Sequence, residues 1–316
     1  MESLNIGLFG NDVDLLKDVA KAFGKKGTES DITLYNHKSG ELVVTTILPH
    51  SYPDKIQSLF YTINLCDLPV IVIGALNQTL GELLLILDKV GFEKGLIFLK
   101  EEYMKDQIQN LISKTTMKDF EIMVYTDETA INELRIKTLD MKINNEDNNQ
   151  PYVSIDHSFG VKGVGTVALG ILRNGGLKAY DKFKIVPSMK DTMVRSIQKH
   201  DQAFKDAIPG ERVGLSLKDL KPEDVPRGHI ISNVAKELKK VKILINKNEF
   251  YKEEIKKDDI LYLSIGMQFF LVNVISNGKE LEIESDKKFA YVTGMKIFVL
   301  DLNAKQRFVG TAKIIE

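Results

Sequence analysis

Apolar residues along the first 140 positions alternate between short continuous runs and helical repeats. An apolar run at residues 5–9 ends at Gly10, and apolar residues then recur at helical spacing from Val13 to Phe23. The same patterns predict further strands at 42–48, 70–73, 95–99 and 121–125, and helices at 53–65, 80–90, 103–112 and 130–139. This alternation predicts a doubly wound α/β domain with a parallel sheet over residues 1–142.

The pattern changes at residues 143–150, which are interpreted as a linker because residues 144–150 are all polar and offer no apolar side chain to bury. Beyond it, short strands are separated by turn residues such as Asn174-Gly175-Gly176 and Pro209-Gly210. The predicted strands are 153–159, 165–172, 182–186, 193–198, 212–217, 241–245, 260–264, 268–274, 280–284, 291–292, 296–300 and 308–315. Short strands at this spacing favour two β-barrels, over 151–235 and 236–316, because a closed barrel leaves no exposed strand edge.

The amino-acid composition excludes some kinds of site but does not identify a function. The 43 basic and 44 acidic side chains nearly cancel, so no bulk charge attracts nucleic acid, although a local basic face can still bind RNA. The single cysteine, Cys66, excludes an internal disulfide framework and a paired-cysteine metal site. No signal peptide or membrane-spanning run is evident, so we expect a cytoplasmic protein. The sequence predicts no catalytic residue, no metal and no cofactor.

A long, ordered motif follows the predicted linker. It runs through Ile155-Asp156-His157-Ser158-Phe159, Gly163-x-Gly165-Thr166-Val167, Val194-Arg195-Ser196-Ile197-Gln198, Gly210-x-Arg212-Val213-Gly214-Leu215 and Arg227-Gly228. This run resembles the second domain of the elongation factor Tu class. Within that class the chain most resembles the selenocysteine-specific factor SelB, because Phe289-x-Tyr291-Val292 and Arg307-Phe308-Val309-Gly310 also occur in the order of the SelB third domain. The resemblance covers nearly the whole chain and is weakest in the first domain.

The resemblance to SelB implies an aminoacyl site at Asp156, His157 and Arg212, and a tRNA acceptor-end site at Arg227 and Gly228. A selenol is more acidic than a thiol, so a selenocysteyl group is largely anionic at neutral pH and can be selected by fixed positive charge. Adjacent side chains on a strand point to opposite faces, however, so Asp156 and His157 can share a pocket only where the strand ends, bulges or twists. On residue types alone, solvated turns and surface ion pairs explain both sets, and the functional interpretation depends on the resemblance.

The first predicted loop lacks the pattern of a phosphate-binding loop. That pattern, G-x-x-x-x-G-K-[ST], uses glycines to expose backbone N–H groups and a lysine to neutralise phosphate. The loop starts at Gly10, but Leu15 stands at the second glycine, Leu16 at the lysine and Lys17 at the hydroxyl. A one-residue deletion would let Lys17 serve as the lysine, leaving the glycine and hydroxyl unexplained.

Two other nucleotide motifs also depart from the family pattern. The segment that normally holds Mg²⁺ and positions water aligns with Leu48-Pro49-His50-Ser51-Tyr52. The guanine-reading segment aligns with Leu99-Lys100-Glu101-Glu102, where only Lys100 matches. We therefore expect no GTP binding and no GTPase activity, with the first domain a platform or a partner-binding surface.

These patterns favour a non-hydrolytic, elongation factor-like protein that binds an aminoacyl-tRNA, with selenocysteyl-tRNA as the specific expectation. Two alternatives remain open: a divergent nucleotide-binding factor that uses Lys17, and a scaffold that docks on the ribosome or on an authentic elongation factor. The lysine-rich stretch at 236–242 is a further candidate for contact with a tRNA backbone. The stretch at 252–257 is interleaved and flanked with acidic residues and is interpreted as a solvated surface.

Overall fold

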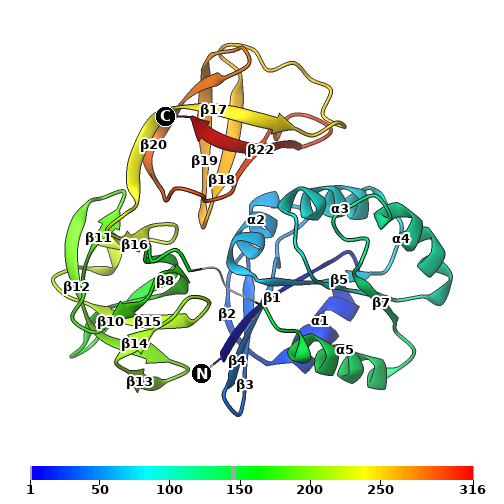
Figure 1. The fold of residues 1–316 in the computed structure, drawn as a ribbon, viewed down its shortest axis with the longest axis horizontal. Helices are drawn as coiled ribbons and strands as arrows, with labels where there is room; N and C mark the ends of the chain where they lie inside the picture. The colour runs from blue at the N-terminus through cyan, green and yellow to red at the C-terminus, as the bar shows by residue number, and fades with distance from the viewer. Residues whose placement is uncertain (1, 144–146, 316) are drawn as a thin grey trace. The chain divides into compact units, whose positions relative to one another are not determined.

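The structure is a computed structural model that describes residues 2–143 and 147–315. The chain divides into two compact units, Met1–Asn144 and Asn145–Glu316 (Figure 1). The predicted linker at 143–150 falls partly on residues 144–146, which lie outside the described residues. None of the helices in the described ranges is long and apolar enough to span a bilayer.

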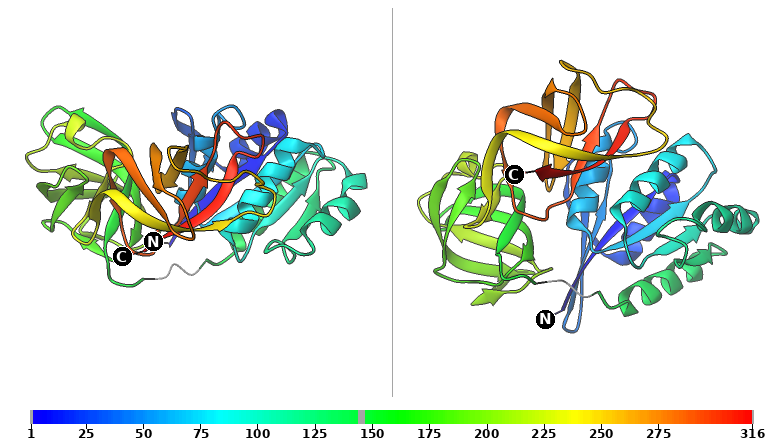
Figure 2. Two further views of the ribbon diagram at one scale, coloured as in Figure 1. Left: turned by 90° about the horizontal axis from the view of Figure 1, so that it is seen from above. Right: turned by 45° about the horizontal axis from the view of Figure 1, so that its top comes forward.

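The first unit is a seven-stranded sheet covered by helices on both faces (Figures 1 and 2). Its elements are β1 (Glu2–Gly10), α1 (Val13–Phe23), β2 (Lys25–Glu29), β3 (Thr33–Ser39), β4 (Leu42–Leu48), α2 (Ile56–Leu65), β5 (Leu68–Ile73), α3 (Gln78–Val90), β6 (Leu96–Leu99), the 3-10 turn η1 (Glu102–Met104), α4 (Lys105–Ile112), β7 (Glu121–Val124) and α5 (Glu128–Asp140). The apolar sides of α1 and α5 bury residues such as Leu16 and Leu134 against β1. Strands β1, β5 and β6 are buried along nearly their whole length, as expected of the centre of a parallel sheet.

The sheet is parallel over β4, β1, β5, β6 and β7, as predicted for a doubly wound domain, and an antiparallel strand near one edge makes it mixed. Its order is β2-β3-β4-β1-β5-β6-β7, and β3 runs antiparallel to both β2 and β4. The sequence patterns missed β2 and β3 because β2 is polar and exposed at the sheet edge, and β3 is apolar only over its first residues. Helix α2 begins at Ile56 rather than Pro53, since residues 53–55 form a turn.

The second unit begins with a closed six-stranded barrel, to which β13 adds a short edge strand. The barrel order is β11-β16-β8-β9-β15-β12, and pairing of β11 with β12 closes it. The elements of this region are β8 (Tyr152–Val161), β9 (Gly165–Asn174), β10 (Leu177–Lys178), β11 (Lys182–Val186), β12 (Lys190–Lys199), β13 (Gln202–Phe204), β14 (Asp206–Ala207), β15 (Arg212–Leu217), η2 (Pro222–Asp224) and β16 (Ile230–Ser232). Alternate residues of β8 and β15, such as Ile155 and Val213, fill its core.

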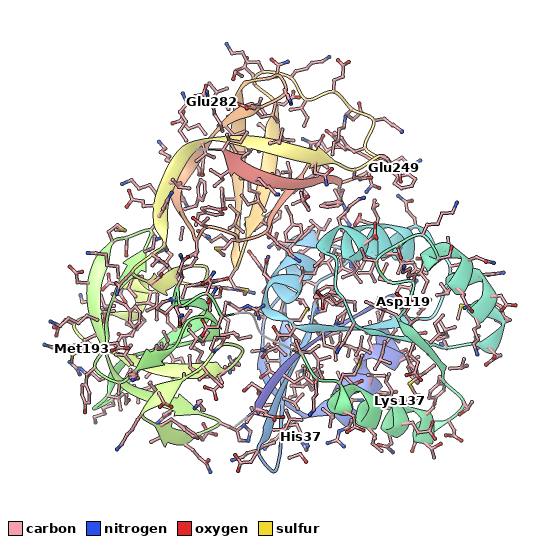
Figure 3. The ribbon with its side chains drawn as sticks, in the orientation of Figure 1. His37, Asp119, Lys137, Met193, Glu249 and Glu282 are labelled. Atoms are coloured by element: carbon pink, nitrogen blue, oxygen red, sulfur yellow. The ribbon has the colours of Figure 1, made fainter. Side chains whose placement is uncertain are left out.

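A second closed barrel follows in the same unit, in the order β17-β20-β19-β18-β21-β22. Its strands are β17 (Lys236–Lys247), β18 (Ile260–Ile265), β19 (Gln268–Ser276), β20 (Leu281–Tyr291), β21 (Ile297–Leu300) and β22 (Phe308–Ile315). Met193 on β12 and Glu282 on β20 locate the two barrels in Figure 3. A small apolar cluster of Val186, Ile230 and Ala290 contains residues of both barrels, so their surfaces pack together.

Candidate functional site

Arg212 and Asp156 come together on the outer surface of the first barrel. The Nη2 atom of Arg212 donates to both carboxylate oxygens of Asp156, at 2.9 and 3.1 Å. The Asp156 side chain is 4% exposed and that of Arg212 is 17% exposed, so the pair is largely removed from water. These two residues are 56 positions apart in the sequence. The sequence analysis predicted that they share one site, and the fold brings them into contact.

The pair uses only one nitrogen of the guanidinium group. Arg212 has five N–H donors in a planar fork, and a bidentate carboxylate would engage two of its nitrogens. Here both carboxylate oxygens bind Nη2, and Nε is buried with no hydrogen-bond partner among the described residues. A buried donor without an acceptor costs about 1–3 kcal/mol, so Arg212 is incompletely satisfied by Asp156. The side chain is 17% exposed, and this exposed part is what a ligand could reach.

A β-bulge puts Asp156 and His157 on the same side of β8. Ile155 lies opposite Gly170 and His157 lies opposite Leu169, so Asp156 is an extra residue on this strand. Ile155 points into the barrel core, and Leu169 lies on the outer side because its neighbour Ala168 is a core residue. Both Asp156 and His157 therefore face outward, which resolves the objection from strand alternation.

His157 occupies a different environment from Asp156. It is exposed, and its ring lies 5.7 Å from the ring of Phe159, two residues further along the strand. In the structure, Asp156 is therefore paired with Arg212, whereas His157 lies next to this pair and contacts Phe159. The imidazole and phenyl rings form an exposed aromatic surface beside the buried ion pair.

The turn at Arg227 and Gly228 lies directly against the bulged strand. The backbone N–H of Gly228 donates to the carbonyl oxygen of Ile155 at 3.1 Å, and the N–H of Ile155 donates to His229 at 3.2 Å. Gly228 has a φ of +90°, and a Cβ there would lie 2.8 Å from the carbonyl oxygen of Met267 on the second barrel. The turn at Arg227 and Gly228 is therefore next to the strand that carries Asp156 and His157. Burial lowers the pKa of His229, so this histidine favours the neutral form and positive charge here comes from the arginines.

A buried ion pair that the sequence patterns missed supports the strand that carries Arg212. The Nζ atom of Lys199 lies 2.8 Å from both carboxylate oxygens of Glu211, which also accepts the backbone N–H of Ile208. Glu211 directly precedes Arg212. Both partners were interpretable in sequence only as ordinary charged residues, because nothing local marks a lysine and a glutamate as buried.

In the first unit, the carboxylate of Asp12 lies in the loop after β1 and is hydrogen-bonded within the protein. Asp12 caps α1 by accepting the backbone N–H of Leu15 at 3.0 Å, and Lys100 donates to its other oxygen at 2.8 Å. A Cβ added to Gly74, at the end of β5, would lie 2.6 Å from this carboxylate, which packs closely on the β5 loop. Burial raises the pKa of Asp12, but the hydrogen bonds from Lys100 and Leu15 outweigh it and the pKa lies below its ordinary value.

Lys100 is therefore paired within the protein rather than directed at a ligand. Its hydrogen bond to Asp12 raises its pKa and fixes the ammonium group. The missed signal was local: an aspartate directly before an apolar helical repeat is a typical helix N-cap.

A pocket of about 210 Å³ lies beside this loop. It is lined by Gly10, Asn11, Val13, Leu16, Lys17, Leu48, Pro49, His50, Tyr52, Pro53, Asn77 and Thr79. Sites for drug-sized ligands usually exceed about 300 Å³. Asn11 and Asn77 are hydrogen-bonded to each other and to backbone groups. The basic side chains that line the pocket are Lys17 and His50.

Comparison with known proteins shows which proteins this chain resembles in sequence and in fold. The family described as elongation factor Tu domain 2 matches residues 165–232. An uncharacterized protein of Methanocaldococcus jannaschii is 38% identical over 99% of this chain and 100% of its own length. The selenocysteine-specific elongation factor of the same organism is 28% identical, and the match covers 84% of this chain and 65% of that factor. The crystal structure of the elongation factor SelB from Methanococcus maripaludis, in complex with the GTP analogue GppNHp, aligns with a TM-score of 0.86 at 21% identity, covering 100% of this chain and 79% of that one.

Proposed function

We propose that this chain, which is similar to SelB and matches elongation factor Tu domain 2 over residues 165–232, binds aminoacyl-tRNA through its second unit without using GTP as a switch. The observation that carries the proposal is the buried Arg212–Asp156 pair with its unsatisfied Nε donor. The setting we propose is the cytoplasm, where tRNA and ribosomes are found.

Arg212 supplies the selectivity in this proposal. A selenocysteyl side chain is largely anionic at neutral pH, whereas a seryl side chain is neutral. An anionic atom beside the exposed part of Arg212 would gain from a charge that cannot be lost by deprotonation, and it would accept from Nε only if the neighbouring side chains moved. A hydroxyl would gain less, so we propose selenocysteyl-tRNA as the preferred ligand and seryl-tRNA as the form discriminated against.

The neighbouring residues have supporting roles in the proposal. Asp156 holds the guanidinium group in place, and His157 with Phe159 offers an exposed aromatic surface next to it. The Arg227–Gly228 turn is fixed to β8 by two backbone hydrogen bonds and would contact the acceptor end of the tRNA. The bulge at Asp156 is the feature that puts Asp156 and His157 on the same face of β8.

The first unit supports the absence of nucleotide switching. A phosphate at the start of α1 would meet the Asp12 carboxylate, which already accepts the N–H of Leu15 and the ammonium group of Lys100. Like charges this close cost free energy, and the helix N-terminus that normally attracts phosphate is already capped. In the family, the γ-phosphate orders the switch segments; we propose that release here depends on a partner or on modest affinity.

Two binding assays test the two parts of the proposal. Purified protein is titrated with selenocysteyl-tRNA and seryl-tRNA in a filter-binding assay, and with GTP, GDP and ATP in Mg²⁺ by calorimetry. We expect tighter binding of selenocysteyl-tRNA and no heat from nucleotide at high micromolar concentration. Equal binding of the two tRNAs would remove the role of Arg212, and Mg²⁺-dependent GTP binding would overturn the loss of switching.

The pocket beside Lys17 favours the second candidate, a divergent nucleotide-binding factor. In that case nucleotide binding would fall on substitution of Lys17, while Lys100 would have to leave Asp12. The third candidate, a scaffold on the ribosome or on an elongation factor, predicts partner binding that is unaffected by substitution of Asp156, His157 and Arg212.

A further inference from the structure

The pocket beside Lys17 lies where the order of strands in the first unit reverses. The chain passes from β1 to β4, which lies beside one edge of β1, and then to β5, which lies beside the other edge. Gly10 ends β1, Leu48 ends β4 and Asn77 follows β5, and all three line the pocket. Ligands of open α/β sheets bind outside the carboxyl ends of the strands at such a point, so the position is favourable for a small ligand.

The carboxylate that opposes phosphate at the start of α1 does not fill this pocket. Asp12 accepts from Lys100, which follows β6, and packs on Gly74, which follows β5. It is not one of the lining residues. The hydrogen bonds of Asp12 therefore leave the neighbouring pocket unfilled, and a ligand there need not displace this side chain.

Most of the pocket wall is apolar. Leu16, Leu48 and Pro49 are buried, whereas Val13 is 63% exposed, so the first three form the inner wall. The hydroxyl of Tyr52 donates to the carbonyl oxygen of Thr79 at 3.2 Å and holds the ring in place. An apolar cavity of about 150 Å³ is enough to bind benzene. The pocket, at about 210 Å³, therefore has room for a ring or a branched chain with one polar group.

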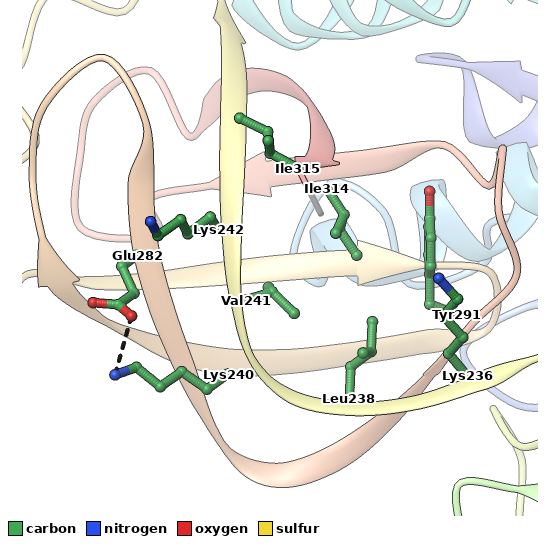
Figure 4. Close-up of a pocket in the computed structure, with 9 residues that line it drawn as sticks. All are labelled: Lys236, Leu238, Lys240, Val241, Lys242, Glu282, Tyr291, Ile314 and Ile315. Carbon is green, nitrogen blue, oxygen red and sulfur yellow. Dashed lines mark ion pairs between the residues drawn. The ribbon is translucent and has the colours of Figure 1, made fainter.

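The charged side chains that line this pocket are basic. They are Lys17 and His50, and no aspartate or glutamate lines it within the described part of the chain. Helix α3 begins here with the neutral cap Asn77 and has no acidic residue in its first turn, so its N-terminus also favours an anion. A hollow of about 340 Å³ on the second barrel differs in this respect, because it contains Glu282, which pairs with Lys240 at 3.1 Å (Figure 4).

We propose that the pocket of the first unit binds a small monocarboxylate with an aromatic or branched apolar body. The body would contact Leu16 and Leu48, and the carboxylate would accept from Lys17. Lys17 is 4.0 Å from the exposed carboxylate of Asp14, and a ligand replaces so weak a pair at little cost. The site lies in the first unit, so its test is independent of the tRNA-binding assay.

The test uses benzoate, titrated into the whole protein and followed by NMR of labelled valine and leucine methyl groups. We expect the signals of Val13, Leu16 and Leu48 to shift, with saturation at millimolar concentration, and those of Leu263 and Val272 in the second barrel to stay in place. Benzyl alcohol has the ring without the charge, and inorganic phosphate has the charge without the ring. Each should bind at least about fivefold more weakly than benzoate.

Two substitutions test the role of charge. Lys17→Met should weaken benzoate binding about fivefold, the scale of a partly exposed charge pair. Lys21→Met is the matched control, because Lys21 lies on the same helix, pairs with Asp18 at the same spacing and does not line the pocket. Val13→Glu adds a carboxylate at the exposed part of the pocket and should abolish binding. The first turn of a helix accepts glutamate, so thermal unfolding should show this variant to be folded.

Several results would overturn the proposal. Benzoate could shift none of the three methyl signals, phosphate or benzyl alcohol could bind as tightly as benzoate, or Lys17→Met and Lys21→Met could weaken binding equally. GTP that binds more tightly than benzoate, with the same dependence on Lys17, would assign the pocket to a nucleotide instead.

Discussion

Lys199 and Glu211 form a buried ion pair in the first barrel, with the ammonium nitrogen 2.8 Å from both carboxylate oxygens and side-chain exposures of 8% and 3%. Lys199 also lies over the ring of Phe204, 4.1 Å from its centre. The pair joins the end of β12 to the residue before Arg212. Glu211 of this ion pair therefore lies directly beside Arg212 of the proposed aminoacyl site, at the start of the strand that carries it.

Removal of one partner of this pair should destabilise the protein strongly. Lys199→Met leaves Glu211 buried and uncompensated, and we expect the free energy of unfolding to fall by about 3 kcal/mol. The measurement is urea unfolding, with Lys184→Met as the control. Lys184 forms an ion pair with Asp191 at the same distance of 2.8 Å, but that pair is exposed and should contribute less than about 1 kcal/mol. Equal effects of the two substitutions would contradict the importance of burial.

Arg212→Lys should reduce the preference for selenocysteyl-tRNA about tenfold, equivalent to about 1.4 kcal/mol. A lysine keeps the charge but cannot hold Asp156 and offer a second, fixed donor in the same plane. The competition between selenocysteyl-tRNA and seryl-tRNA measures this ratio directly. Arg195→Lys is the matched control, since Arg195 lies on the same barrel, 45% exposed and 4.0 Å from Asp219. An unchanged ratio in Arg212→Lys would show that charge alone is sufficient.

Asp12 should contribute a pH-dependent part of the stability of the first unit. Its pKa in the folded protein is lowered, so the ionised form is favoured by folding. That stabilisation is fully present above the unfolded pKa of about 3.9 and is lost as the pH falls through the lower folded value. Asp12→Asn retains a good helix cap but lacks the charge.

The stability of wild type relative to Asp12→Asn should therefore be constant from pH 5 to 7, on a scale of about 1 kcal/mol, and shrink below about pH 3.9. Unfolding by urea at each pH measures the difference. A difference that grows as the pH falls would mean that the carboxyl group is not stabilised as an anion.

Gly228→Ala should destabilise the second unit by more than backbone strain alone. The positive φ of Gly228 costs an alanine about 1–2 kcal/mol, and its Cβ would also lie 2.8 Å from the Met267 carbonyl oxygen. Gly294→Ala is the control, because Gly294 has a φ of +93° and open space around the added carbon. The difference in thermal stability between the two variants measures the cost of the contact with Met267. Equal losses of stability would show that the turn can shift to accommodate the added carbon without disturbing the second barrel.

Local sequence determined the strands whose apolar residues are continuous or strictly alternating. The predicted ranges at 42–48, 182–186, 212–217 and 308–315 agree with β4, β11, β15 and β22, because burial of such runs is decided by the side chains themselves. The order of motif residues also identified the family and named Asp156 and Arg212 as members of one site. Strand β2 was missed because a polar edge strand is stabilised by pairing, which the sequence does not record. Strand β3 was missed because only its first residues are apolar.

The tertiary structure alone decided how the charged residues are used. The bulge at Asp156 depends on the register between β8 and β9, and a change of one residue in that register would reverse the face of His157. Lys100 meets Asp12 across 88 positions, and Lys199 meets Glu211 inside a closed barrel. A charged side chain carries no local mark of its partner, because that partner is set by strand order and packing rather than by neighbours in the chain.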